Sequence, residues 1–219
     1  MLASVLAGLS ILIVGDSHLG SNGYLIDTLH DALLADGAQV HTIGVCGTNP
    51  GDWVQSVQGT CGGAERRGKA PLVKQNPAKT QPIGQLIDAD KANLVIVIMG
   101  DTIGGYKQDA FPKTWVWQQV TSFTKVVAEH KTACVWVGPA WGSEGGKYGK
   151  TYAKAQQISS FLSNNVAPCS YVDSLKFSKP GEWGTIDGQH LTLTAYKYWG
   201  KDIEQAIVQI PALQQLKRP

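Results

Sequence analysis

The chain has 219 residues, of which 43% are hydrophobic and only 16% are charged. This composition excludes a disordered or collagen-like chain, and no repeat is visible, so we expect one domain over residues 1–219. The net charge of +2 conceals an asymmetry, because residues 1–65 contain acids but no Lys or Arg, and all 19 basic side chains follow. These form no basic tract, so the sequence does not predict nucleic-acid binding.

The amino terminus is apolar, interrupted only by small residues, from Met1 to Val14. We interpret residues 1–9 as a lead-in to the first strand or, alternatively, as the remnant of a signal or membrane anchor. The run is too short to span a bilayer and no Lys or Arg precedes it. We expect no other membrane-crossing segment, and a solvated tail over residues 215–219.

Short apolar runs rich in Val and Ile alternate with amphipathic stretches. The predicted strands cover 11–14, 39–45, 94–99, 134–137 and 170–172, and the predicted helices about 24–34, 83–90, 113–129, 151–164 and 192–208. This alternation predicts a three-layer α/β/α, flavodoxin-like fold with a five-stranded parallel sheet, whose ligands bind beyond the carboxyl ends of the strands. We expect the long connections 46–82 and 100–112 to be loops near that edge.

Four cysteines, Cys46, Cys61, Cys134 and Cys169, permit three full pairings. The predicted elements favour 46–61, which flank one loop, and 134–169, which open two successive strands. Since the spacing is neither CxxC nor zinc-like, we favour disulfides and a periplasmic or secreted protein. The alternative is four buried thiols in a cytosolic protein.

The first predicted strand ends in Gly15-Asp16-Ser17-His18, and a helix begins a few residues later. A serine on such a turn presents its hydroxyl at the open edge of the sheet, where a nucleophile is useful. The alternative is that Ser17 only caps the helix.

A second motif, Asp187-Gly188-Gln189-His190, stands just before the last predicted helix. A nucleophilic serine needs a base, and an imidazole acting as base needs an acidic partner. Asp-x-x-His supplies both, although each residue alone could be an ordinary turn or helix-start residue.

In this order and on these elements, the two motifs resemble the SGNH (GDSL-type) hydrolase family over nearly the whole chain. The resemblance implies the same flavodoxin-like fold, with Ser17 as nucleophile, His190 as general base and acid, and Asp187 orienting His190. We expect no cofactor and no metal. We also expect a monomer whose partner is an acetylated saccharide or polysaccharide.

The resemblance further implies an oxyanion hole made by the Ser17 amide, a glycine after the second strand and an asparagine after the third. Gly47 matches the glycine best, and Gly44 is the second choice. The chain departs from the family at Gly100-Asp101-Thr102, where Thr102 replaces the asparagine and the Asp101 carboxylate would repel an oxyanion.

Candidate substrate contacts are the residues near the predicted edge that suit a sugar, namely His18, Trp53, Asp101, Trp141 and Trp183. Indole rings stack on the apolar faces of sugars, although the three tryptophans could instead pack beneath loops. Four others, Trp115, Trp117, Trp136 and Trp199, are expected in the core.

The sequence therefore predicts a serine esterase that forms an acyl-enzyme and removes acetyl groups from a bacterial cell-surface or cell-wall polysaccharide. The Gly-Asp-Ser-His variant resembles SGNH proteins that move or remove such groups. One alternative is an O-acetyltransferase that passes the acetyl group to a sugar hydroxyl. Another is a non-catalytic carbohydrate-binding module on the same scaffold, which Thr102 keeps open.

Overall fold

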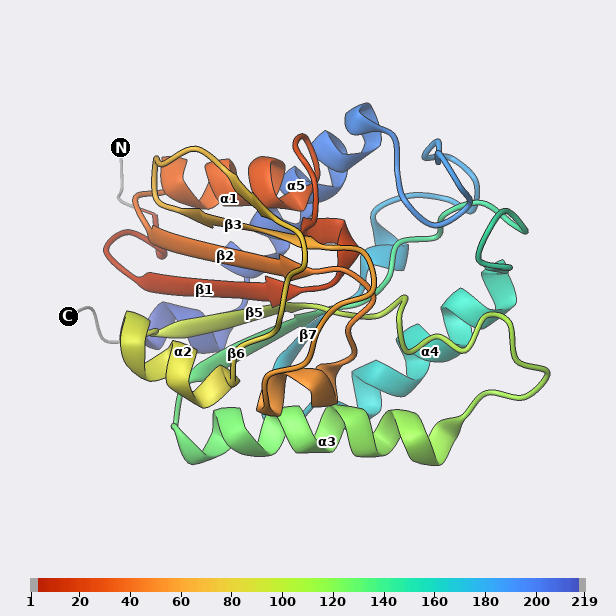
Figure 1. Cartoon of the computed structure of the whole chain (residues 1–219). Helices are drawn as coiled ribbons and strands as arrows, with labels where there is room; N and C mark the ends of the chain where they lie inside the picture. Colours follow the sequence, from red (N-terminus) through yellow and green to blue (C-terminus); the bar gives the residue numbers. More distant parts are fainter. Residues whose placement is uncertain (1–3, 217–219) are drawn as a thin grey trace.

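The structure, a computed structural model, describes residues 4–216 and consists of one twisted sheet between two layers of helices (Figure 1). Its seven strands have the order β4-β3-β2-β1-β5-β6-β7. The parallel part contains β1 (Ser10–Gly15), β2 (Gln39–Val45), β5 (Leu94–Ile98), β6 (Ala133–Val137) and β7 (Ser170–Val172). All five predicted strands are present, in the order of a flavodoxin-like fold.

The connection between β2 and β5 is not the plain loop that we expect from the sequence. It contains a 3-10 helix over Pro50–Val54 and two antiparallel strands, β3 (Gly63–Arg67) and β4 (Val73–Gln75), which extend the sheet beyond β2. The sheet therefore has seven strands, two more than the five that the sequence predicts. Strands at a sheet edge are short and polar, so they lack the apolar run that marks a buried strand.

Two helix layers cover the sheet (Figure 1). Helices α1 (Leu25–Ala35) and α5 (Leu193–Val208) pack against each other on one face, and α2 (Ile83–Asp90), α3 (Lys113–Glu129) and α4 (Tyr152–Asn165) lie on the other. Alternate residues of β1 enter the two cores, with Ile11 and Ile13 facing α1 and α5, and Leu12 and Val14 facing the opposite layer. Because both faces are buried, the strand is apolar throughout.

The described ends of the chain also pack onto the fold. Leu6 and Leu9 of the expected lead-in are fully buried, while residues 1–3 lie outside the described residues. At the other end, a short 3-10 helix over Pro211–Gln215 buries Leu213, and Leu216 packs against the core. Leu216 is therefore not part of a solvated tail, as we expected for 215–219, and residues 217–219 lie outside the residues that the structure describes.

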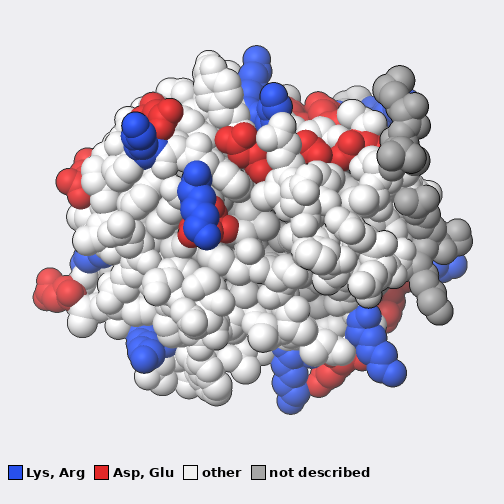
Figure 2. All heavy atoms as spheres, turned by 180° about the vertical axis from the view of Figure 1, so that it is seen from behind, with Lys and Arg blue, Asp and Glu red and all other residues white. Residues whose placement is uncertain are grey.

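Within residues 4–216, no helix is both long and apolar enough to traverse a bilayer. Figure 2 shows Lys and Arg scattered as separate side chains over the face turned away in Figure 1. That face therefore presents no continuous basic area.

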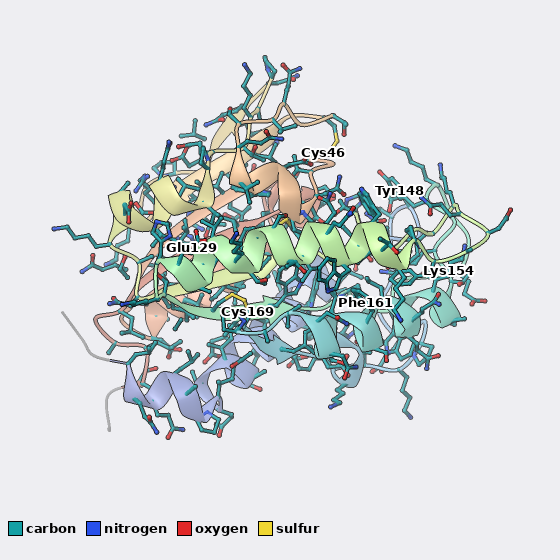
Figure 3. All side chains as sticks on the ribbon, turned by 90° about the horizontal axis from the view of Figure 1, so that it is seen from below. Cys46, Glu129, Tyr148, Lys154, Phe161 and Cys169 are labelled. Carbon is teal, nitrogen blue, oxygen red and sulfur yellow. A yellow bond between two sulfur atoms is a disulfide. The ribbon has the colours of Figure 1, made fainter. Side chains whose placement is uncertain are left out.

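Both favoured cysteine pairs are bridged. Cys46–Cys61 closes the segment after β2 with a Cα–Cα distance of 5.3 Å, and Cys134–Cys169 joins the starts of β6 and β7 at 4.4 Å. Figure 3 shows Cys46 and Cys169 on opposite sides of the long helix α3 in that view. One bridge therefore lies near the carboxyl edge of the sheet, and the other lies at the opposite end of the strands.

Replacing both Cys134 and Cys169 by alanine should lower the free energy of unfolding by about 2–4 kcal/mol, because the unfolded chain gains conformational freedom. Urea titration of the folded double variant measures this change. Reduced wild-type protein, in which both bridges are open, is the comparison and should lose more. A double variant as stable as the oxidised wild type would contradict the bridge.

Candidate active site

Four loops meet beyond the carboxyl edge of the sheet, where the chain order reverses between β1 and β5. Ser17 follows β1 and begins a short 3-10 helix, Gly47 follows β2, Thr102 follows β5, and His190 precedes α5. Open α/β sheets bind their ligands at such a reversal. The sequence motifs that lie far apart along the chain are thus brought to one place.

The three residues of the predicted triad form one chain of hydrogen bonds. Ser17 Oγ lies 2.7 Å from His190 Nε2, and His190 Nδ1 lies 2.7 Å from Asp187 Oδ2. Since Nδ1–H donates to the carboxylate, Nε2 faces the serine hydroxyl as an acceptor. Ser17 is half-buried and His190 is 8% exposed, so the hydroxyl remains reachable while the imidazole is held.

Asp187 is held as a carboxylate by its neighbours. Burial acts to raise the pKa of Asp187, but hydrogen bonds from the His190 N–H, the His190 ring and the Gln189 N–H outweigh it, and the pKa lies below the ordinary value. The two N–H groups donate to Oδ1 at 2.8 and 3.1 Å. Asp187 can therefore orient the imidazole and stabilise its protonated form.

Three potential hydrogen-bond donors belong to residues that share a hollow: the Ser17 N–H, the Gly47 N–H and the Thr102 hydroxyl. The backbone N–H groups of Ser17 and Gly47 donate to no other described residue. The Thr102 hydroxyl is buried and also lacks a partner among residues 4–216. Ser17, Gly47 and Thr102 all line the same hollow.

The two candidate glycines have different surroundings. Gly47 has a φ of 74°, and a Cβ there would collide with the Thr60 hydroxyl, so the turn requires glycine. Gly44 lies inside β2, where Leu19 packs directly against it. Gly44 therefore serves packing, and of the two glycines only Gly47 reaches the hollow.

Asp101 lines the same hollow as Thr102, and its carboxylate is a buried ion-pair partner. Its side chain is 1% exposed and accepts hydrogen bonds from Lys150 Nζ at 2.7 Å, His18 Nε2 at 2.8 Å and the Tyr106 hydroxyl at 2.5 Å. Burial acts to raise the pKa of Asp101, but Lys150 and His18 outweigh it and hold the pKa far below its ordinary value. The Lys150 ammonium thus neutralises the carboxylate that we expected to repel an oxyanion.

His18 is also internal, which corrects the prediction that it contacts substrate. It is 3% exposed, and both ring nitrogens are used within the protein. Nε2–H donates to Asp101, and Nδ1 accepts from the Tyr196 hydroxyl at 2.7 Å. His18 therefore ties the turn that bears Ser17 to the loop after β5 and to α5.

The structure does not support the prediction that three tryptophans contact the sugar. None of the three expected sugar contacts lines the hollows beside Ser17. Trp53 is fully buried and donates to Thr48, Trp141 donates to two backbone carbonyls, and Trp183 belongs to the core. These three side chains therefore pack inside the protein and do not face the hollows beside Ser17.

Among the four tryptophans expected in the core, Trp136 and Trp199 are buried there. Trp115 and Trp117 are instead 36% and 50% exposed, near the start of α3. The prediction of core positions is wrong for these two.

Ser17 stands between two hollows in the surface. The larger, of about 340 Å³, is lined by Gly47, Thr102 and Gln189, and the smaller, of about 210 Å³, by Tyr24 and His190. The Cys46–Cys61 bridge and Tyr148 border both, and Figure 3 shows Cys46 and Tyr148 at the same end of the molecule. Ser17 is thus accessible from two hollows.

Four residues of this site were not recognised in the sequence: Tyr24, Tyr148, Lys150 and Gln189. Tyr24 stands at the start of the predicted helix 24–34 and carries no further signal, and the segment before α4 has no motif that distinguishes Tyr148 or Lys150. Only Gln189 carried a signal, because it lies inside the Asp-x-x-His motif.

Comparison with known proteins finds a relative by sequence and several solved structures with a similar fold. No protein-family model matches the chain. The chain is 45% identical over 217 residues to Protein BcsX of Komagataeibacter xylinus. The aligned region covers 98% of this chain and 81% of BcsX.

Solved structures with a similar fold include a catalytic mutant of an acetylxylan esterase from Geobacillus stearothermophilus (TM-score 0.60, 16% identity, 93% of this chain and 95% of that one). A second is a GDSL-like lipase from Bacteroides thetaiotaomicron, with a TM-score of 0.56 and 14% identity over 90% of this chain and 86% of that one. A third is a peptidoglycan O-acetylesterase, with a TM-score of 0.55 and 10% identity over 92% of this chain and 91% of that one. These likenesses confirm the predicted fold, which is that of the SGNH hydrolases.

Replacing Lys150 by methionine should lower the free energy of unfolding by about 3–5 kcal/mol, because Asp101 would remain buried without its cation. The control is Lys176→Met, since the Lys176 side chain is 81% exposed and lies 3.9 Å from Asp173. That change should cost at most about 1 kcal/mol. Urea titration at neutral pH measures both.

The stabilisation by Asp101 should also depend on pH in a defined direction. A carboxyl whose folded pKa is depressed stabilises the fold above its unfolded pKa, near about 4, and loses that contribution as the pH falls through the folded value. The difference between wild type and Lys150→Met should therefore shrink in acid. Equal losses for Lys150→Met and Lys176→Met at neutral pH would contradict the ion pair.

Proposed function

Because the chain belongs to the BcsX family and has the SGNH hydrolase fold, we propose that it is a serine esterase that removes acetyl groups from a bacterial cell-surface or cell-wall polysaccharide. The observation that carries the proposal is the chain of hydrogen bonds Ser17–His190–Asp187, with 2.7 Å between each pair of bonded atoms. Two of the similar structures have names that describe esterases acting on acetylated carbohydrates.

In the first half of the reaction, Ser17 Oγ attacks the acetyl carbonyl carbon while its proton passes to His190 Nε2. The carbonyl oxygen becomes an oxyanion, which accepts hydrogen bonds from the N–H groups of Ser17 and Gly47 and from the Thr102 hydroxyl. The bond between the acyl carbon and the sugar oxygen then breaks, and that oxygen takes the proton from His190. The products of this half are the free sugar hydroxyl and acetyl-Ser17.

In the second half, water attacks the acetyl-Ser17 ester and gives its proton to His190. The ester bond breaks, Ser17 Oγ regains the proton, and acetate leaves with release of one proton to solvent. Ser17 is half-buried between two hollows, so water can approach the acyl-enzyme.

We place this reaction outside the cytoplasm. Both cysteine pairs are bridged, and structural disulfides persist in oxidising compartments. Protein recovered from such a compartment should show no reactive thiol after denaturation without reductant. Four reactive thiols would contradict the placement and leave the esterase proposal intact.

Ser17→Ala should reduce hydrolysis of a small chromogenic acetate ester by at least about a thousandfold, because no other described group occupies the nucleophile position. Ser163→Ala, which changes an exposed serine on α4, is the matched control and should retain the wild-type rate. Equal rates for Ser17→Ala and the control would reject the esterase and leave a binding module.

Thr102→Val removes a hydroxyl while keeping nearly the same shape. If the hydroxyl donates to the oxyanion, kcat should fall by about 100-fold with little change in KM, since the hydrogen bond forms only in the transition state. Thr102→Ser keeps a donor and should recover much of the loss. An unchanged kcat for Thr102→Val would show that the two backbone N–H groups suffice.

A further inference from the structure

We propose that the sugar carrying the ester binds in the smaller hollow, against Tyr24 and Ile186, and that the acyl group points into the larger one. This inference rests on the proposed esterase function. It adds the side of Ser17 on which each half of the substrate binds, and it assigns a saccharide-binding role to two residues outside the triad.

The position of the acid fixes where the sugar oxygen leaves. His190 must deliver a proton to that oxygen, so the oxygen has to come within about 2.6–3.2 Å of Nε2. His190 and Asp187 line the smaller hollow and do not line the larger one. The sugar attached to the leaving oxygen therefore occupies the smaller hollow.

Two of the three proposed oxyanion donors belong to residues of the larger hollow. Gly47 and Thr102 line the larger hollow and do not line the smaller one. The carbonyl oxygen consequently points toward the larger hollow. With the smaller hollow filled by the sugar, the remaining substituent of the acyl carbon has its space in the larger hollow, whose volume is about 340 Å³.

The smaller hollow also has the surface that a sugar ring needs. The Tyr24 ring stacks on Tyr196 with centroids 4.2 Å apart and lies 6.2 Å from the His190 ring. On another side of the imidazole, the Tyr148 ring stands edge-on at 5.6 Å. Apolar faces of sugars pack against such aromatic rings, so the base is flanked by two surfaces that can hold the substrate.

Ile186 completes this surface. It directly precedes Asp187, lines the smaller hollow and is 63% exposed. Its exposed side chain can therefore be contacted by a ligand bound in that hollow. Because Ile186 is exposed, its side chain can be changed with little effect on the folded state, which makes it the sharpest probe of the proposal.

The test compares substrates that share the acetyl group and differ in the alcohol. Hydrolysis of an acetylated xylo-oligosaccharide and of methyl acetate is followed by acetate release. Ile186→Ser should raise KM for the oligosaccharide at least fivefold and leave kcat/KM for methyl acetate within twofold, since methanol is too small to reach Ile186. Val73→Ser, at an apolar residue of β4 that is 59% exposed, is the matched control and should change neither.

A second variant probes the other side of Ser17. Gln108 is an exposed residue that lines the larger hollow. Because both substrates carry the same acetyl group, Gln108→Ala should change KM for the oligosaccharide and for methyl acetate by the same factor, within twofold. If Gln108→Ala raises KM for the oligosaccharide alone and Ile186→Ser does not, the assignment is reversed and the proposal falls. It also falls if neither variant changes the KM.

The outcome for wild type separates this proposal from the proposed function. Wild-type protein that hydrolyses methyl acetate through Ser17 but no acetylated oligosaccharide would remain an esterase without the inferred sugar site. Wild-type protein that hydrolyses neither substrate would overturn both.

Discussion

The candidate site depends on one buried ion pair, between the Asp101 carboxylate and the Lys150 ammonium. Their atoms lie 2.7 Å apart, and both side chains are 1% exposed. Through His18, the same carboxylate is linked to the turn that bears Ser17 and, by Tyr196, to α5. Removing one partner of such a pair leaves a buried charge, which is costly. The pair therefore fixes the loop after β5 relative to the nucleophile.

The contrast with Asp16 shows what the cation contributes. Asp16 is also fully buried, but one of its oxygens lacks a partner among the described residues, and burial raises its pKa. Asp101 has Lys150, and its pKa is lowered. The carboxylate next to Thr102 is thus a neutralised charge, which explains how a threonine hydroxyl can stand where a negative neighbour would otherwise oppose an oxyanion.

Local patterns predicted the parts of the molecule that local patterns determine. Buried runs such as 94–98 and the Asp-x-x-His turn before α5 carry their own signal, so the parallel strands and the triad were recognised. Strands β3 and β4 are polar edge strands, and their pairing depends on β2. Lys150 becomes a buried cation only because it meets Asp101, 49 residues away. Contacts of this range leave no periodicity in the sequence.

The loops around Ser17 are fixed from two directions. The Cys46–Cys61 bridge closes the segment that carries Gly47, and the Asp101–Lys150 pair holds the segment that carries Thr102. Donors aimed at a developing charge are effective only when they need not reorganise during the reaction. Because a covalent bridge holds one of these loops and a buried ion pair holds the other, neither loop needs to rearrange during a reaction. The Cys46–Cys61 bridge, as long as it is oxidised, therefore also restrains the segment that carries Gly47.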